Sequence, residues 1–177
     1  MATVQFSVES ITIYDLGVSG AMGTGNPVRL SPIAEDSVSL SIPEATSNDI
    51  KSEDVSGVVA SLPTEPDAST WNFESMDFSN ESLKNYFGGT IDEATKTYSY
   101  PATGAPVIQK SFELITKPYG GVKYKYMIPV MQLSASGDIQ FVKTDVSKIS
   151  AKGKILTPFD AEGLPLSPWK RQEIAVV

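Results

Sequence analysis

Alternation between apolar and polar residues over residues 106–158 constrains the fold of this chain more than any other feature. Ile108, Phe112 and Leu114 share one parity, and residues 122–130 repeat the alternation with apolar side chains at every second position. A period of two is what a pleated strand with one buried face requires. The stretch therefore predicts three or four successive strands that form an antiparallel β-meander.

Turn and bulge signals divide this stretch. Residues 117–121 combine proline and glycine and predict a turn. The apolar parity changes after Val130, which predicts a bulge near Pro129 because proline cannot donate to a strand ladder. We expect a second turn at residues 136–138, a new strand starting at residues 139–141, and a last strand with apolar residues alternating from Ile149 to Ile155.

Further strands are expected in the first half of the chain. Residues 4–13 predict a strand with a break near Glu9. Residues 38–42 predict a strand whose serines form a solvent-exposed face. Residues 71–78 predict a strand whose parity shifts midway, and Tyr98 and Tyr100 open another. The glycine-rich residues 16–36 between them lack the pattern of a phosphate-binding loop and predict a flexible loop.

One short helix is expected at about residues 79–88. Ser79 suits the N-cap, and Glu81 suits the positive end of the first turn. Leu83, Tyr86 and the residue after it form one apolar stripe, and Gly88-Gly89 ends the helix. A helix this short is unstable alone in water, so it must pack against the sheet.

Two segments outside this framework predict arms. Residues 44–67 are acidic and interrupted by prolines, with a possible short strand at residues 55–62. So long a stretch is either a functional arm that becomes ordered on contact with a partner or a mobile solvated loop. Residues 159–177 contain several prolines and predict an extended C-terminal arm that packs against the body or a neighbour.

Composition favours a single domain without catalytic chemistry. A chain of 177 residues fits one domain spanning residues 1–177. The sequence contains no cysteine and no histidine, which removes thiolate chemistry, the commonest general base and the commonest transition-metal ligand. We predict no catalytic, cofactor-binding or metal-binding residues and no enzyme activity. Neither a signal peptide nor a membrane-spanning segment is expected.

Charge is distributed unevenly along the chain. Residues 1–98 hold 15 acidic and 4 basic residues, whereas residues 99–177 hold 6 acidic and 10 basic residues. Such asymmetry can mark opposite faces that meet in self-assembly, and chance clustering on a soluble surface is the alternative. The overall acidity argues against tight binding of DNA.

The order of these pieces resembles the major tail tube protein of long-tailed bacteriophages, within the superfamily that includes type VI secretion tubes. The resemblance is best over residues 38–158. It rests on the segment Trp71-Asn72-Phe73-Glu74, the helix stop Asn85-Tyr86-Phe87-Gly88-Gly89, and the closing segment Gly153-Lys154-Ile155-Leu156-Thr157-Pro158. The glycine-rich residues 17–27 and the C-terminal arm match less obviously.

The resemblance implies an antiparallel β-sandwich or barrel-like tail tube fold with one flanking helix. It implies hexameric rings that stack into a hollow tube, through which double-stranded DNA and the tape-measure protein pass. The expected partners are further copies of the chain, the tape-measure protein, the tail terminator and baseplate or tip proteins. The expected location is the virion, after synthesis in the bacterial host cytoplasm, with no cofactor and no catalytic residue.

Charge asymmetry and the long arm together suggest where copies would touch. Residues 44–67 are long enough to reach an adjacent ring, and their acidic side chains would face the basic meander there. The candidate contact residues between subunits or rings are Glu53, Asp54, Val58, Glu65, Lys148, Lys152 and Trp169.

Two other readings of the sequence remain open. One is the tube protein of a contractile or type VI-like injection machine. The other is a β-sandwich module, without catalytic activity, that binds carbohydrate or protein. Hollow rings or tubes in images of the purified protein would favour a tube, whereas an exposed aromatic platform on a monomer would favour the binding module.

Overall fold

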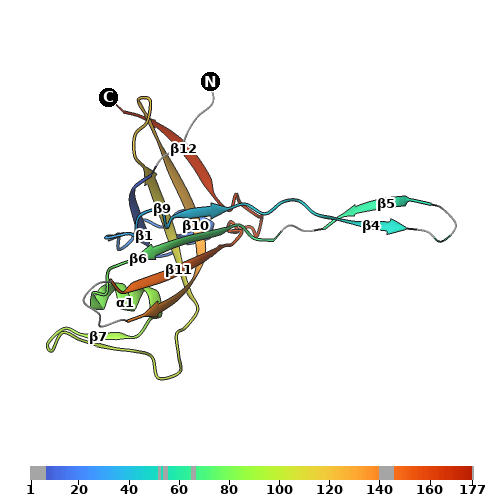
Figure 1. The fold of residues 1–177 in the computed structure, drawn as a ribbon. Coiled ribbons are helices and arrows are strands. Elements are labelled where there is room, and N and C mark those ends of the chain that lie inside the picture. Colours follow the sequence, from blue (N-terminus) through green and yellow to red (C-terminus); the bar gives the residue numbers. More distant parts are fainter. Residues whose placement is uncertain (1–6, 52, 54–55, 65–66, 140–145, 177) are drawn as a thin grey trace.

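The described residues form mostly antiparallel β-structure with one α-helix, as the sequence predicted (Figure 1). The computed structural model describes residues 7–51, 53, 56–64, 67–139 and 146–176. In chain order the elements are β1 (Val8–Tyr14), the 3-10 helix η1 (Val18–Gly20), β2 (Val28–Leu30), β3 (Ser39–Ser41), β4 (Ser47–Lys51), β5 (Val58–Pro63), β6 (Thr70–Ser75), α1 (Asn80–Phe87), β7 (Thr90–Asp92), β8 (Thr97–Ser99), β9 (Ile108–Thr116), β10 (Val122–Asp138), β11 (Lys148–Ile155) and β12 (Lys170–Ala175).

The 17-residue strand β10 organises the main sheet, whose order is β2-β1-β9-β10-β11-β6-β3. β9 lies along one edge of β10, and its register with β10 shifts between Ile128 and Met131. The other edge of β10 pairs with β12 before this shift and with β11 after it. The bulge predicted near Pro129 is therefore confirmed, and it marks the point where the sheet divides.

The segment that runs from β2 to β3 closes the sheet into a barrel-like body. β2 pairs with β1 at one end of the sheet, and β3 pairs with β6 at the other end. Between them, Ile33 forms a bridge to Ser75 of β6, and the Ala34 N–H donates to the Glu74 carbonyl at 2.8 Å. One continuous segment thus contacts both ends of the sheet, and this curls the sheet around a single core.

The inward faces of the strands build that core. In β11, Ile149, Ala151, Gly153 and Ile155 are buried while the lysines and serine between them are exposed, so the predicted alternation is confirmed. The other buried core residues come from β1, β2, β6, α1, β9 and β10: Ile11, Ile13, Leu30, Trp71, Phe73, Tyr86, Phe112, Leu114, Tyr124, Tyr126, Ile128, Met131 and Leu133.

Helix α1 lies at the end of the barrel opposite to the C-terminal end of β12 (Figure 1). The predicted caps are confirmed: the Ser79 hydroxyl accepts from the Ser82 N–H, and Gly88 follows the helix with φ of 75°. Tyr86 enters the core, where its ring centroid lies 6.2 Å from that of Phe73. The helix therefore seals this end of the barrel with an aromatic side chain.

Because Tyr86 is buried, the fold is expected to lose stability at alkaline pH. Loss of solvent around the phenol raises its pKa from 10.0 to about 12. The folded state therefore holds this proton more tightly than the unfolded chain does. The contribution of Tyr86 to the free energy of unfolding is fully present below pH 10 and is lost between pH 10 and 12. We expect this tyrosine alone to remove about 2–3 kcal/mol from the free energy of unfolding across that range.

Urea unfolding at several pH values between 9 and 12, with the Tyr86→Phe variant as control, measures this contribution. The variant should lose stability less steeply with pH, because lysines and other tyrosines titrate equally in both proteins. Parallel pH profiles for the two proteins would show that Tyr86 ionises normally.

Several expectations about strand ends are corrected. The turn expected at residues 136–138 is wrong, because β10 continues through them and pairs with the start of β11. Ile139 follows the end of β10 and is not in a strand, and Phe141, the other residue expected there, lies outside the described residues. β6 ends at Ser75, so Met76 and Phe78 belong to the loop before α1.

Other boundaries differ in smaller ways. The break expected near Glu9 is confirmed by a register shift between Val8 and Ser10 in the pairing with β9. β3 covers only Ser39–Ser41, and Tyr100 lies beyond the end of β8. The C-terminal arm is not extended throughout. It makes a turn after Pro158 and then adds β12 to the body.

Candidate interaction surfaces

Neither a metal centre nor a membrane-spanning helix is found in the part of the chain that the structure describes. Within residues 7–51, 53, 56–64, 67–139 and 146–176, no three acidic side chains gather closely enough to hold a metal ion. In the same residues, no helix has both the length and the apolar character needed to cross a bilayer.

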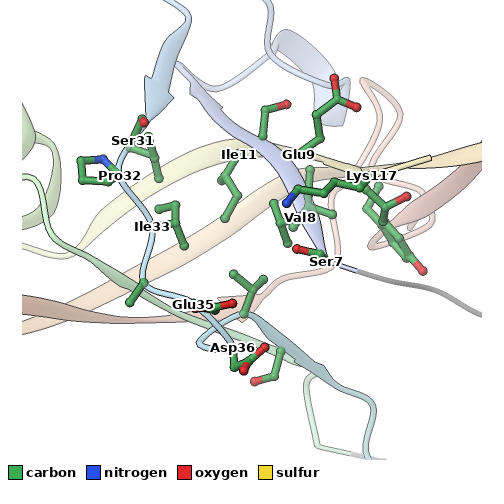
Figure 2. Close-up of a pocket in the computed structure, with 18 of the residues that line it drawn as sticks. Ser7, Val8, Glu9, Ile11, Ser31, Pro32, Ile33, Glu35, Asp36 and Lys117 are labelled. Carbon is green, nitrogen blue, oxygen red and sulfur yellow. The ribbon is translucent and has the colours of Figure 1, made fainter. Parts of the chain in front are cut away.

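A cleft of about 880 Å³ opens between the start of β1 and the segment that joins β2 to β3 (Figure 2). It exists because β2 pairs with β1 only from Ile11 to Ile13 and then turns away toward β6. Core side chains such as Leu30, Trp71 and Leu114 reach its lining. The cleft is thus a gap between two parts of the barrel wall.

Charged side chains of both signs surround this cleft. Figure 2 shows Glu9 and Lys117 on one side and Glu35 and Asp36 on the other. Arg29 donates to the Glu9 carbonyl at 3.3 Å, and the Glu9 carboxylate forms an ion pair with a lysine of β10 at 3.4 Å. Because these charges nearly balance, the rim does not select strongly for an anion or a cation.

The β4–β5 hairpin, which we call the arm, is the most unusual surface of the molecule. It extends well away from the body (Figure 1), and every described residue of its two strands is exposed. The exposed fractions are 46% for Ile50, 51% for Val58, 56% for Val59 and 55% for Leu62. A two-stranded hairpin alone is marginally stable in water, so these apolar groups suggest a partner.

Register divides the arm into two different faces. Ile50 lies opposite Ala60, and Leu62 lies opposite Asn48, so these four side chains share one face. Asp49 and Ser61 lie opposite each other on the other face, where the Ser61 hydroxyl donates to the Asp49 carboxylate at 2.8 Å. We call Ile50, Ala60 and Leu62 the apolar face of the arm.

The structure brings some predicted contact residues together on the arm. Within residues 44–67, where the sequence predicted either an arm or a mobile loop, the described residues include the paired strands β4 and β5. Glu53 lies between β4 and β5 and is exposed, and Val58 begins β5. Asp54 and Glu65 lie outside the described residues.

The remaining predicted contact residues lie on the body. Lys148 and Lys152 share the exposed face of β11, far along the chain from the arm. Trp169 precedes β12 and packs against its own subunit, with its ring centroid 6.1 Å from that of Tyr126.

Part of the charge asymmetry is balanced within the chain, because three of the four ion pairs that meander lysines form join a lysine of residues 99–177 to a carboxylate of residues 1–98. Four lysines of the meander form ion pairs with carboxylates of the same chain: Lys110 with Asp15 at 2.6 Å, Lys123 with Glu9 at 3.4 Å, Lys125 with Glu113 at 2.6 Å and Lys148 with Glu74 at 3.5 Å. The hydrogen bonds from Lys110 and Asn26 lower the pKa of Asp15 below its ordinary value. Charges on the arm and on Lys152 are therefore better candidates for contacts between copies than those of Lys148.

The sequence predicted a short strand at residues 55–62, which overlaps β5, but it did not identify the apolar face that β4 and β5 form together. Ile50 and Leu62 are separated by the turn, and neither belongs to a long alternating run. The available signal was weak: residues 48–50 and 60–62 each show the spacing of a short strand. Only the register between the two strands places them on one face.

No protein-family model matches the chain. No curated protein matches it.

Proposed function

We propose that this chain is the subunit of a self-assembling tube of the kind found in long-tailed bacteriophages. The observation that carries the proposal is the arm, which holds uncovered apolar side chains far from the body. Because the arm extends away from the body, it is placed to contact another copy rather than its own barrel. Hexameric rings that stack into a hollow conduit for DNA ejection are the assembly that the sequence resemblance implies.

Open strand edges support assembly through identical copies. Among the described strands, β12 pairs only with β10, and its other edge has no strand beside it. Lys170, Arg171 and Glu173 on β12 are charges typical of an edge that is protected against random pairing. An edge on one side of the body and an arm on another make a head-to-tail contact, which generates rings or filaments.

Other parts of the proposal follow from the resemblance. The tape-measure protein, the tail terminator and baseplate or tip proteins are the partners, and double-stranded DNA passes through without staying bound. The net charge of −7 is consistent with this passage, because an acidic wall repels phosphates. The subunit acts in the virion as a structural protein, without a cofactor or catalysis. A contractile or type VI-like machine would use the same type of subunit.

Imaging of the purified chain tests the proposal. We expect negative-stain images at increasing protein concentration to show hollow rings and then tubes of constant width. Sedimentation velocity on the same samples should show monomers converting into large particles over a narrow concentration range. A chain that stays monomeric at every concentration and salt condition would refute self-assembly. It would then favour the binding module, although the exposed tyrosines Tyr100 and Tyr119 lie on separate loops.

A further inference from the structure

The cleft between β1 and the segment that joins β2 to β3 lies where the wall of the barrel is interrupted (Figure 2). On one side of it, β1 pairs with β9 along its first edge, whereas β2 occupies the second edge only from Ile11 to Ile13. Among the described residues, no strand lies beside that second edge from Val8 to Ser10. The backbone of β1 therefore presents hydrogen-bonding groups toward the cleft, and the Arg29 side chain reaches one of them, the Glu9 carbonyl.

The opposite wall of the cleft has an open edge as well. Ile33 bridges to Ser75 and the Ala34 N–H donates to the Glu74 carbonyl, and β3 continues this pairing along β6. All of these contacts use the edge that faces β6. In the described part of the chain, the edge that faces the cleft pairs with no strand. An extended segment placed in the cleft would thus find backbone partners on its walls.

The interior of the cleft defines the side chains that such a segment needs. Buried apolar residues reach its lining, namely Leu30, Trp71, Leu114 and Tyr126. Val8 and Leu40, one from each wall, are partly buried and pack against the same core. Because an added strand turns alternate side chains inward and outward, the segment should be apolar at every second position. The nearly balanced charges of the rim call for no charged side chain on it.

Residues 1–6 have this pattern in their sequence, although they lie outside the described residues. Apolar side chains stand at Ala2, Val4 and Phe6, and polar ones at Thr3 and Gln5. The segment contains no proline and no charged side chain. Six extended residues span about 20 Å. The segment joins the described chain at Ser7, which itself lines the cleft.

The attachment of Ser7 favours the cleft of another copy over the cleft of the same subunit. The Lys117 N–H donates to the Ser7 carbonyl at 2.9 Å, so this end of β1 remains beside its own β9. To enter its own cleft, the chain would have to reverse direction immediately before Ser7. Tight reversals between strands favour glycine, asparagine, aspartate or proline, and residues 1–6 contain none of these.

We propose that residues 1–6 of one copy enter the cleft of a second copy as an added strand. The inference rests on the proposed function and names a contact through which copies associate. Backbone hydrogen bonds to the open edges hold the segment, and Val4 and Phe6 cover the apolar interior. Each copy gives one segment and receives one, and this head-to-tail arrangement closes into a ring.

Crosslinking tests this contact without background because the chain contains no cysteine. A size-tagged chain carries Gln5→Cys, and an untagged chain carries Ser31→Cys, at an exposed position in the lining of the cleft. The two chains are mixed as monomers, assembled and treated with a short bismaleimide reagent. We expect about tenfold more crosslinking than with Ser99→Cys, because neighbouring thiols have a high effective concentration. Ser99→Cys is the matched control at an exposed position outside the cleft.

A single chain with both Gln5→Cys and Ser31→Cys shows which copy provides the cleft. Below the assembly concentration it should stay uncrosslinked by mass spectrometry, and an efficient crosslink within one chain would overturn the contact between copies. Tubes that form while Gln5→Cys and Ser31→Cys crosslink no better than the control would overturn the contact and leave the tube subunit standing. If the unmodified chain remains monomeric at every concentration, both proposals fail.

Exchanging residues within the segment tests the alternation itself. Val4→Gln with Gln5→Val moves an apolar side chain to the opposite face at constant composition. We expect the concentration needed for assembly to rise about tenfold, because one buried valine is lost. Thr3→Gln with Gln5→Thr exchanges two residues of the same face and should change that concentration by less than about twofold. Equal effects of the two exchanges, or no effect of the first, would contradict the added strand.

Discussion

Replacing both Ile50 and Leu62 by aspartate is expected to weaken the proposed self-assembly strongly while leaving the body of the protein folded. Each side chain is about half exposed in the single subunit, so the substitutions remove little from its core. Full burial of an Ile or Leu side chain contributes about 1.5–3 kcal/mol, and only about half of each side chain is still exposed, so losing both weakens each contact by about 1.5–3 kcal/mol. The concentration required for assembly should therefore rise by about tenfold to a hundredfold. Light scattering and negative-stain images measure this shift.

A matched variant separates apolar contact from added charge. Ser47→Asp with Ser56→Asp adds the same two negative charges to the arm, at exposed positions away from its apolar face. We expect this variant to assemble far better than the Ile50→Asp, Leu62→Asp protein. Equal loss in both variants would mean that charge alone controls assembly. Circular dichroism melting should show all three proteins folded with similar midpoints.

Removing the Phe73 ring should cause the largest loss of stability from a single substitution. Phe73 is 1% exposed on β6 and contacts two other aromatic rings, those of Tyr86 of α1 and Phe112 of β9. It therefore links the helix to strands on different sides of the core. Phe73→Ala should lower the free energy of unfolding by about 3–5 kcal/mol, because the barrel cannot collapse around the cavity. For a chain of this length, the melting midpoint should fall by roughly 6–20 °C.

Chemical unfolding of the wild type, Phe73→Ala and Val107→Ala measures this effect. Val107 is largely exposed, so its truncation should change the unfolding free energy by less than about 0.5 kcal/mol. A loss below about 1 kcal/mol at Phe73 would mean that this part of the core is loosely packed.

The difference between predicted and observed strand ends has a physical cause. Ser136 and Gly137 have the composition of a turn, and sequence alone predicted one there. In the structure they extend β10, because β11 pairs along them and the Phe87 ring of α1 lies 3.4 Å from the position of a Cβ on Gly137. Pairing with a distant strand and contact with the helix thus override the local preference for a turn.

The arm shows the same limit of prediction from the local sequence. Its composition and length marked residues 44–67 as either an arm that contacts a partner or a mobile solvated loop. The apolar face needs the pairing of Ile50 with Ala60 and of Asn48 with Leu62. A slip of one residue in that register would move half of these side chains to the opposite face. Sequence spacing could not fix this choice, since neither strand has a long alternating pattern.

The sequence by itself determined the antiparallel β class, the caps of α1, the bulge near Pro129 and the buried face of β11. These features depend on the order of neighbouring residues and on the period of the backbone. Only the tertiary structure decided that the segment from β2 to β3 closes the barrel, and that η1 meets the turn after β11. Those contacts join residues far apart in the chain, where no local period or capping rule applies. The exposed apolar surfaces can be identified only when the positions of all the other apolar side chains are known.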